Sequence, residues 1–444
     1  MAATYGPPSA AEGAISRFHW KIEVIGGLPL ALTAMDTLIL SFALVQLVEA
    51  WHLAPMEIGA IAVAQAVGML LGGVLIGNAA DRIGRLLTLR LSLALTSLGT
   101  GLGAIAWGYL PLSMFQFIAG IGMAGVGPVV SAFVGEYAPA RHRGQLSTGL
   151  ELFWGLGSTL AALASLFILP FLGWRLAFVL GALPLLWALA LGRFMPESPR
   201  YLVGQGRRDK ARQIVARIKE RYGLDYDHLM DQPASENKGL LSSVGELWSG
   251  PLMKRTLCTW LLWFVLVFTY YGIFMWLPTL MRTSGLEAMR TIQYMLVFLA
   301  AQMPAVAGAA LLVDIVGRKR ILITTLTLCG VSSYMFGRAS SPGEILLWGS
   351  LLSLSNTVGY GVMLCYTSEL FPTRLRATGA GLASSFGRLG GIAVPGAMAL
   401  LISSWSTGYE LVFIMFAVLL LLGALQVGFL GEETRGRTLE DIAI

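Results

Sequence analysis

Charged residues are scarce in this chain of 444 residues. Asp, Glu, Lys and Arg together make up 13% of it, against roughly 25% in a soluble domain. Hydrophobic residues make up 56%, and the mean hydropathy is +0.70. The shortage of charge extends over the whole length, so dividing the chain into two or three soluble domains by length alone would misread it.

Residues that bind metals or form disulfides are also few. The three cysteines fall in apolar stretches, with neither a disulfide framework nor a metal-binding spacing: Cys258, Cys329 and Cys365. The four histidines are scattered, at His19, His52, His142 and His228. We therefore expect no metal and no cofactor, and we identify no catalytic residue, so an enzyme is not predicted.

The chain does contain long apolar runs from end to end. A spanning helix needs about 20 mostly apolar residues, because the hydrocarbon core of a bilayer is about 30 Å thick. Backbone groups must pair inside lipid, and the alternating pattern of a barrel is absent, so these runs should be helices. The sequence predicts an all-α membrane protein with twelve spanning helices, at about 24–48, 58–78, 88–107, 111–135, 145–171, 174–194, 256–281, 290–313, 321–338, 343–367, 378–402 and 409–430.

The first apolar run is expected to stay in the chain as a spanning helix. Residues 1–23 are polar and include Arg17, Lys21 and Glu23. They do not have the short apolar core and small-residue site of a cleaved signal.

The positive charges gather on one side of the predicted helices. The net charge is +6 and the pI is near 9.3. Loops on one side contain Arg82, Arg85, Arg90, Arg141, Arg143, Arg318, Lys319, Arg320, Arg374 and Arg376. Loops on the other side contain only Arg175, Arg282, Arg290 and Arg338. This asymmetry predicts a multi-pass protein of the plasma (inner) membrane, with both termini and the loop between helices 6 and 7 in the cytoplasm. It also explains the net charge without nucleic acid.

Two motifs recur 233 positions later in the chain. The residues Asp81, Gly84, Arg85, Glu136, Pro139 and Arg143 are matched by Asp314, Gly317, Arg318, Glu369, Pro372 and Arg376. We infer a six-helix half over 1–200, a cytoplasmic segment over 201–255 and a second six-helix half over 256–444. Transporters built this way hold a small molecule between the halves, near the middle of the membrane, and rock one half against the other.

The segment between the halves is polar. The stretch 207–222 favours a helix with Ile214, Val215 and Ile218 on one side, and 225–240 is expected to be a loop. The helix either lies under the bundle or is a solvated basic linker held by membrane charge.

The repeated charged motifs lie at the predicted cytoplasmic mouth. Each places a carboxylate and a guanidinium at a helix end, with a glycine that permits a tight turn. Carboxylates there can pair with arginines or with helix N-termini, and such pairs would hold the mouth shut in the outward-open state. Simple positive-inside anchoring is the alternative, and the presence of two copies favours a gate. The predicted gate residues are Asp81, Arg82, Gly84, Arg85, Glu136, Arg143, Glu197, Arg200, Asp314, Gly317, Arg318, Glu369 and Arg376.

Three ionisable residues fall well inside predicted helices: Asp36, Glu151 and Arg388. A charge at a helix centre costs about 2.5–3.5 kcal/mol or more, so each is a functional candidate. Arg388 offers a fork of donors that matches a carboxylate, and Asp36 or Glu151 could carry a proton. The alternative is a permanent structural ion pair between Arg388 and one of the two acids.

Aromatic residues are dense in the same helices. Trp154 follows Glu151 by three positions and shares a helix face with it. Tyr270 and Tyr271 precede Gly272, near a point where helix 7 could bend. We expect the substrate-binding residues to be Arg388, Trp154, Tyr270, Tyr271, Tyr360, Gln302 and Asn356.

These motifs resemble the major facilitator superfamily over nearly the whole chain. Asp81 to Arg85 is similar to its loop 2–3 signature. The segments 196–200, 136–144 and 432–436 look like the sugar-porter and organic-ion branches, where they form a cytoplasmic charge network. The segments 34–42, 150–157, 270–278 and 368–381 resemble the niacin-transporter group (NiaP-type), which is related to the synaptic vesicle glycoproteins.

The resemblance implies a transporter that imports a small organic anion. Sugar porters carry a sugar-binding glutamine where this chain has Glu151, which argues against a hexose. Arg388 lies where organic-anion members carry an arginine, whereas Thr33 and Ala34 depart from the acidic pattern of helix 1. We expect a monomer in the lipid bilayer that imports an aromatic monocarboxylate such as nicotinate with protons. The alternatives are transport of another organic ion or a sugar, export of drugs, and a binding protein that does not transport.

Overall fold

The computed structural model describes residues 15–139, 143–230, 240–250, 252–283, 287–372, 375–404 and 408–435. These residues form helices and connecting segments without a strand. Four predicted gate residues have side chains that lie outside the described part: Asp81, Arg143, Asp314 and Arg376.

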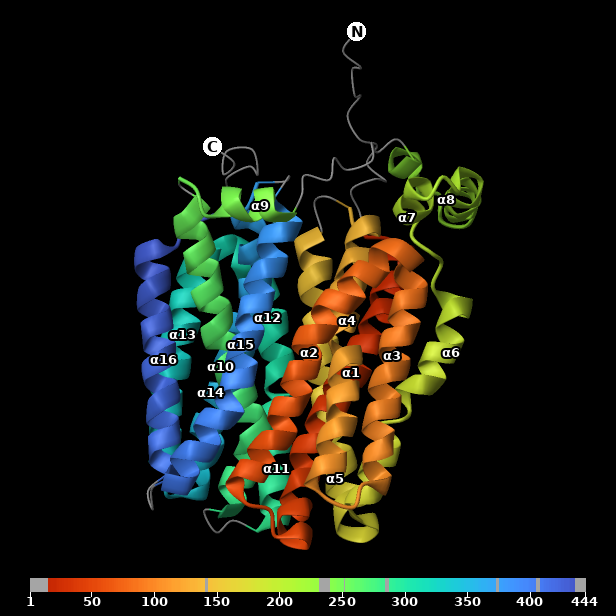
Figure 1. The fold of residues 1–444 in the computed structure, drawn as a ribbon. Coiled ribbons are helices and arrows are strands. Elements are labelled where there is room, and N and C mark those ends of the chain that lie inside the picture. The colour runs from red at the N-terminus through yellow and green to blue at the C-terminus, as the bar shows by residue number, and fades with distance from the viewer. Residues whose placement is uncertain are drawn as a thin grey trace.

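The helices form two groups joined by a short connector (Figure 1). The first half consists of α1 (Arg17–Trp51), α2 (Pro55–Ile83), α3 (Arg85–Leu102), α4 (Tyr109–Tyr137), α5 (Arg143–Leu180) and α6 (Pro184–Phe194), with the 3₁₀ turn η1 (Gly103–Ile105) after α3. The connector contains α7 (Pro199–Gly204), α8 (Arg208–Tyr222), η3 (Asp227–Met230) and α9 (Leu240–Leu247). The second half consists of α10 (Leu252–Thr283), α11 (Ala288–Ala300), α12 (Gln302–Val316), α13 (Arg318–Gly337), α14 (Pro342–Leu370), α15 (Arg376–Ser404) and α16 (Gly408–Leu430).

The packing of the first half is repeated in the second. Helix α1 packs on α5 as α10 packs on α15, and α3 packs on α4 and α6 as α13 packs on α14 and α16. The contacts between the halves show the same correspondence. Helix α2 of the first half packs on α15, and its counterparts in the second half, α11 and α12, pack on α5. At the centre α1 meets α10, where the Ser41 hydroxyl donates to the carbonyl oxygens of Phe274 (3.2 Å) and Met275 (2.7 Å).

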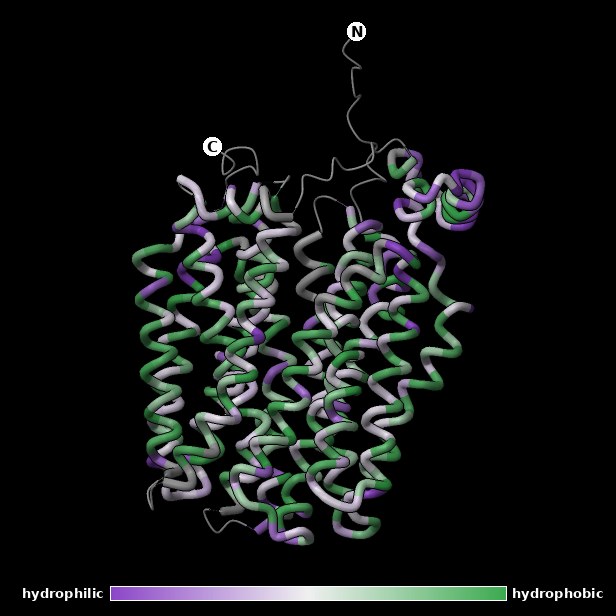
Figure 2. Tube along the Cα trace, in the orientation of Figure 1, coloured by the Kyte–Doolittle hydropathy of each residue, from purple (hydrophilic) through white to green (hydrophobic). Residues whose placement is uncertain are grey.

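Nine of the described helices are long and apolar enough to cross a membrane. Three predicted spans do not meet this criterion of length and apolar composition, and the structure shows why. The predicted span 174–194 follows a kink at Gly173 (φ 73) and is divided at 181–183 between the end of α5 and the 11 residues of α6. Helix α13 begins with three basic residues, and α15 carries Arg388 among many glycines and serines. The nine and these three correspond to the twelve predicted spans, and the residues of the helical bundle are largely hydrophobic (Figure 2).

Local sequence sets the helix ends. Ser16 caps α1, because its side chain accepts from the backbone N–H of Phe18 at 3.2 Å, while its own N–H donates to His19 Nδ1 at 2.9 Å. Ser341 and Glu344 form the same kind of capping box at the start of α14. Helix α1 starts at Arg17, so the spanning helix begins several residues before the predicted start at about 24.

The connector differs in part from the sequence prediction. Helix α8 matches the predicted helix 207–222, with Ala211, Val215 and Ile218 buried. The loop predicted over 225–240 is wrong for 227–230, which form η3, because Tyr226 holds this segment against the bundle. The Tyr226 hydroxyl donates to the Tyr137 carbonyl at 2.8 Å and lies 2.9 Å from His19 Nε2. The rest of that predicted loop, 231–239, lies outside the described residues.

Candidate functional site

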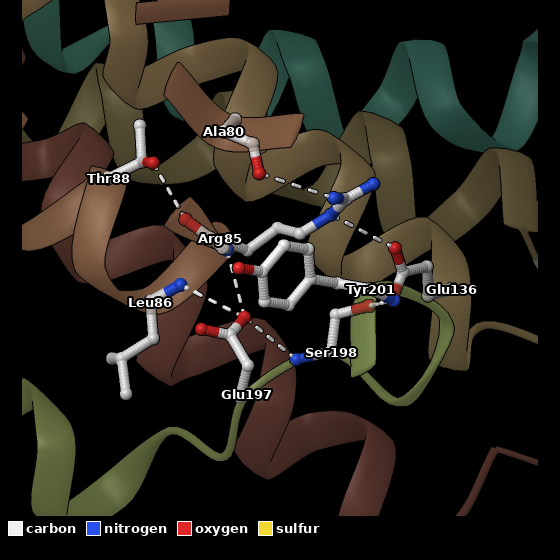
Figure 3. Close-up of polar contacts among 9 residues, drawn as sticks. Ala80, Arg85, Leu86, Thr88, Glu136, Glu197, Ser198 and Tyr201 are labelled. Carbon is white, nitrogen blue, oxygen red and sulfur yellow. Dashed lines mark hydrogen bonds and ion pairs between the residues drawn. The ribbon is translucent and has the colours of Figure 1, made fainter. Parts of the chain in front are cut away.

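A charge cluster lies where α3 begins, at the end of the bundle that also carries α7, α8 and α9 (Figures 1 and 3). Arg85 Nε is 3.3 Å from Glu136 Oε1 on α4. Glu197, in the link after α6, accepts from the backbone N–H of Arg85 at 2.8 Å. The Ser198 hydroxyl donates to the other oxygen of Glu136. One ion pair and two hydrogen bonds therefore tie α3, α4 and this link together.

A second cluster repeats these contacts in the second half. Arg318 Nη2 is 2.9 Å from Glu369 Oε1 on α14. Glu433 accepts from the backbone N–H of Arg318 at 3.0 Å. The Thr434 hydroxyl donates to Glu369 Oε2 at 2.5 Å. We call the end of the bundle that contains both clusters the motif end.

The glycine before each arginine has a backbone that other residues rarely adopt. Gly84 has φ 99 and ψ 162, and Gly317 has φ 101 and ψ 149. This region is almost exclusive to glycine. A Cβ atom at Gly84 would lie 2.9 Å from Cδ of Glu197, and one at Gly317 would lie 2.8 Å from Cδ of Glu433. The glycines therefore let the two glutamates reach the helix starts.

Each of the two clusters lies within its own half of the molecule. Among the described residues, no ion pair joins the cluster of one half to the other half. Arg82 is exposed, and its carbonyl accepts from the Tyr201 hydroxyl at 3.0 Å. Arg200 lies close enough to Glu136 to act on its charge. The described contacts brace helix ends, and gating stays a prediction.

Glu433 and Thr434 belong to the second cluster, although the repeat of 233 did not identify them. Glu197 and Ser198 recur as Glu433 and Thr434 at an offset of 236, because the second half has three more residues before this point. Both pairs consist of a glutamate followed by a residue with a hydroxyl group, and this shared dipeptide could have identified Glu433 and Thr434 from the sequence.

A second group of predicted residues meets in the middle of the bundle, between the halves. Trp154 on α5 donates from Nε1 to the Tyr270 hydroxyl on α10 at 2.5 Å. The rings of Tyr270 and Tyr360 have centroids 6.0 Å apart. The Tyr271 hydroxyl lies 3.5 Å from the sulfur of Met69 on α2. Aromatic side chains from both halves thus form one wall.

Two charged residues border this wall. The phenol of Tyr360 is close enough to Glu151 and Arg388 to interact electrostatically with both. Arg388 reaches from α15 toward α2, since its Nε lies 3.8 Å from where a Cβ atom on Gly73 would be. Among the described residues, neither Arg388 nor Glu151 forms an ion pair, so a permanent ion pair of Arg388 is absent there. We call this group the central cluster: Glu151, Trp154, Tyr270, Tyr271, Tyr360 and Arg388.

Asp36 lies apart from the central cluster. Its side chain is fully buried, and neither carboxylate oxygen has a hydrogen-bond partner. Oδ1 lies 3.1 Å from where a Cβ atom on Gly181 would be, and Thr100 on α3 borders the same position. Asp36 therefore faces the interior of the first half.

The two predicted amide residues are bonded inside the second half. Gln302 Nε2 donates to Ser353 Oγ at 2.9 Å, and Asn356 Nδ2 donates to Thr269 Oγ1 at 3.2 Å. Both amides are buried, and both keep a side-chain carbonyl oxygen without a hydrogen bond.

Two similarly packed halves of spanning helices are the architecture of a membrane transporter of the major facilitator fold. Residues 10–444 match the family model described as "Sugar (and other) transporter". The chain belongs to this family, which confirms the resemblance noted from the sequence. It is a transporter and not an enzyme.

Individual relatives cover nearly the whole chain. The niacin transporter NiaP of Acinetobacter baylyi is 40% identical over 97% of this chain and 98% of its own length. A synaptic vesicle 2-related protein of Xenopus laevis is 26% identical over 96% of this chain and 80% of its own. The xylose transporter XylE from E. coli, in a partially occluded inward-open conformation, has a TM-score of 0.78 at 20% identity and covers 95% of this chain and 100% of its own. The last likeness shows the fold.

Proposed function

We propose that this transporter imports a small aromatic monocarboxylate, such as nicotinate, together with protons and by alternating access. The observation that carries the proposal is Arg388, which forms no ion pair among the described residues although it lies between the halves beside an aromatic wall. The 40% identity to a niacin transporter supports the choice of nicotinate.

Arg388 binds the carboxylate in this proposal. A guanidinium removed from water needs an anionic partner, and its planar fork of donors fits the two oxygens of a carboxylate. Asp36 lies elsewhere in the first half, so it does not supply that partner. An incoming carboxylate satisfies the arginine.

The aromatic ring of the substrate packs on the central wall. Trp154, Tyr270, Tyr271 and Tyr360 offer ring faces and edges, and offset or edge-to-face pairs are favourable with centroids 4.5–7 Å apart. Gln302 and Asn356 are proposed as further hydrogen-bond partners, because each amide keeps an unbonded carbonyl oxygen.

Glu151 is the proposed proton carrier beside the substrate. Glu151 and Arg388 both lie near Tyr360, so a substrate carboxylate bound by Arg388 would place a negative charge near Glu151 and favour its protonated form. Uptake of the anion is then accompanied by uptake of a proton. Asp36, which is buried without a partner, is the second candidate for this role.

We further propose that the motif end faces the cytoplasm, with both chain ends on that side of the plasma membrane. The basic residues gather at this end, as the positive-inside rule requires. In this proposal a monomer with halves at 1–200 and 256–444 rocks about the central cluster, while 201–255 connects them. The charged motifs gate the cytoplasmic mouth through Asp81, Arg143, Asp314 and Arg376.

Uptake by proteoliposomes tests the function. Purified protein is reconstituted, and entry of radiolabelled nicotinate is followed with and without an inward proton gradient, against nicotinamide, xylose and tetraethylammonium as competitors. We expect nicotinate uptake that rises with the gradient, collapses with a protonophore and is not inhibited by the three competitors. Glu151→Gln should abolish the response to the gradient. Uptake of xylose or of the cation in place of nicotinate would reject the proposed substrate.

A further inference from the structure

A second candidate binding site lies at the motif end, outside the central cluster. A pocket of about 390 Å³ opens between the end of α2, α7 and one face of α8. Its basic lining residues are Arg207, Lys210 and Arg217, and Glu197 is its lining carboxylate. Its volume is in the range of small-molecule sites, about 300–1,000 Å³.

Lys210 and Arg217 lie on one face of α8, and the third basic residue of the pocket, Arg207, directly precedes this helix. Lys210, Ile214 and Arg217 recur at three- and four-residue steps, so they share a side of the helix. The adjacent side of the helix is buried and includes Val215 and Ile218. The helix therefore presents these cations toward the pocket, at the polar end of the molecule (Figure 2).

The three cations of the pocket have no carboxylate partner among the described residues. Other cations of the same helix do have one, since Lys219 Nζ is 2.7 Å from Asp225 and 3.3 Å from Asp227. Glu197 is the one lining carboxylate, and its Oε1 already accepts from three backbone N–H groups, those of Arg85, Leu86 and Ser198. Three positive charges and one negative charge leave the lining at +2.

We propose that this pocket binds a phosphate ester. Arg207 and Arg217 supply donor forks that suit phosphate oxygens, and Lys210 adds a point charge. Ile83, Leu202 and Ile214 give the pocket an apolar side for the organic part of the ester. The ester is either an anionic lipid headgroup or a soluble phosphorylated metabolite, because both carry the same chemistry.

The bound ester would fix the connector to the first half. Tyr201 lines the pocket, and its hydroxyl donates to the Arg82 carbonyl at the end of α2 at 3.0 Å. Glu197 lines it too and joins the start of α3 through Arg85 N–H. A ligand held by α8 therefore touches both residues that link the connector to the turn between α2 and α3.

Binding of three soluble probes tests the site. Purified full-length protein in a neutral detergent is titrated, by calorimetry, with dihexanoyl phosphatidylglycerol, sn-glycerol 3-phosphate and dihexanoyl phosphatidylcholine. The double variant Lys210→Gln, Arg217→Gln removes two cations of the pocket. The matched control Arg208→Gln, Arg212→Gln removes two cations of the same helix that do not line it.

The pocket variant should bind phosphatidylglycerol at least about tenfold more weakly than the wild type, because it loses two charge-assisted contacts. The control variant should bind as the wild type does. Tighter binding of phosphatidylglycerol than of glycerol 3-phosphate assigns the pocket to a lipid, and equal binding assigns it to a soluble ester. The proposal is overturned if neither anionic probe binds, if the pocket and control variants lose affinity equally, or if the zwitterionic lipid binds as well as phosphatidylglycerol.

Discussion

At the motif end the two halves are nearly copies of each other, whereas in the middle of the bundle they are not. Arg85 pairs with Glu136 at 3.3 Å, and their counterparts Arg318 and Glu369 pair at 2.9 Å. Even the weak contact of Arg85 with the Ala80 carbonyl recurs, at 3.4 Å and 3.3 Å.

The central cluster has no such symmetry. Adding the offset of 233 to Trp154 gives Gly387, and subtracting it from Arg388 gives Gly155. Tyr270 corresponds in the same way to Thr37. Bracing of helix ends is needed equally in both halves, while a site for a ligand with one charged end needs different side chains on its two sides. The repeated residues should therefore matter for stability and the unique ones for binding.

The largest expected effect is at Arg388. Arg388→Ala should weaken nicotinate binding by about 30-fold to several thousand-fold, or about 2–5 kcal/mol, because a hydrogen-bonded charge partner is lost. Arg388→Lys keeps the positive charge but loses the planar fork of donors, so its affinity for nicotinate should lie between those of the wild type and Arg388→Ala. Calorimetry with nicotinate and nicotinamide checks this series. Equal binding of the acid and the amide by the wild type would exclude a carboxylate site at Arg388.

The loss of a buried ion pair at the motif end should be similar in size, but its effect is on stability and not on binding. Glu136→Gln removes the ion pair with Arg85 and should destabilise the protein by about 3–5 kcal/mol. Glu369→Gln should cost less, because the Glu369 side chain is 20% exposed and that of Glu136 is 6% exposed.

Thermal unfolding midpoints in a single detergent give the order of these variants. Glu410→Gln is the control: its pair with Arg338 at 2.8 Å is exposed and worth about 0–1 kcal/mol. A Glu410→Gln midpoint as low as that of Glu136→Gln would break the comparison.

A smaller effect is expected at the two glycines. Gly84→Ala and Gly317→Ala should each cost about 1–3 kcal/mol, because alanine is strained at these backbone angles and its methyl group meets a glutamate. The two losses should be similar if the clusters are copies. Gly108→Ala is a matched control with an extended backbone and open space, and its unfolding midpoint should not fall. A loss at only one of the two cluster glycines would contradict the equivalence.

The smallest expected effect is on the contact that joins the halves. Trp154→Phe and Tyr270→Phe each remove the hydrogen bond between these side chains. A double-mutant cycle on nicotinate affinity should give a coupling energy of about 1 kcal/mol. Additive losses would show that the two rings act independently of each other in binding.

Much of the fold follows from the sequence because lipid leaves few choices. Apolar runs of sufficient length must be helices, and a fixed offset between charged motifs requires two similar halves. The same motifs predicted that carboxylates at this end can pair with arginines, but only the structure shows that Arg85 pairs with Glu136. The repeat did not show Glu433, because three additional residues shift it out of that offset, and only the family resemblance of 432–436 pointed to it.

The rotation of each helix could not be read from the sequence. Asp36 is in the middle of an apolar helix, like Glu151, yet it faces the interior of the first half while Glu151 faces the other half. In an almost uniformly apolar helix, packing against neighbours decides which side faces the centre. For the same reason the bonds of Gln302 and Asn356 within the second half were not predictable.

The most direct test compares the loss of an arginine in the central cluster with the loss of one at the motif end. Nicotinate affinity and the unfolding midpoint are measured for Arg388→Ala in the central cluster and for Arg318→Ala at the motif end. The account predicts that Arg388→Ala binds nicotinate more weakly but has an unchanged unfolding midpoint. Arg318→Ala should have a lower unfolding midpoint but an unchanged affinity for nicotinate. Full nicotinate affinity in Arg388→Ala, or a loss of affinity in Arg318→Ala as large as in Arg388→Ala, would contradict it.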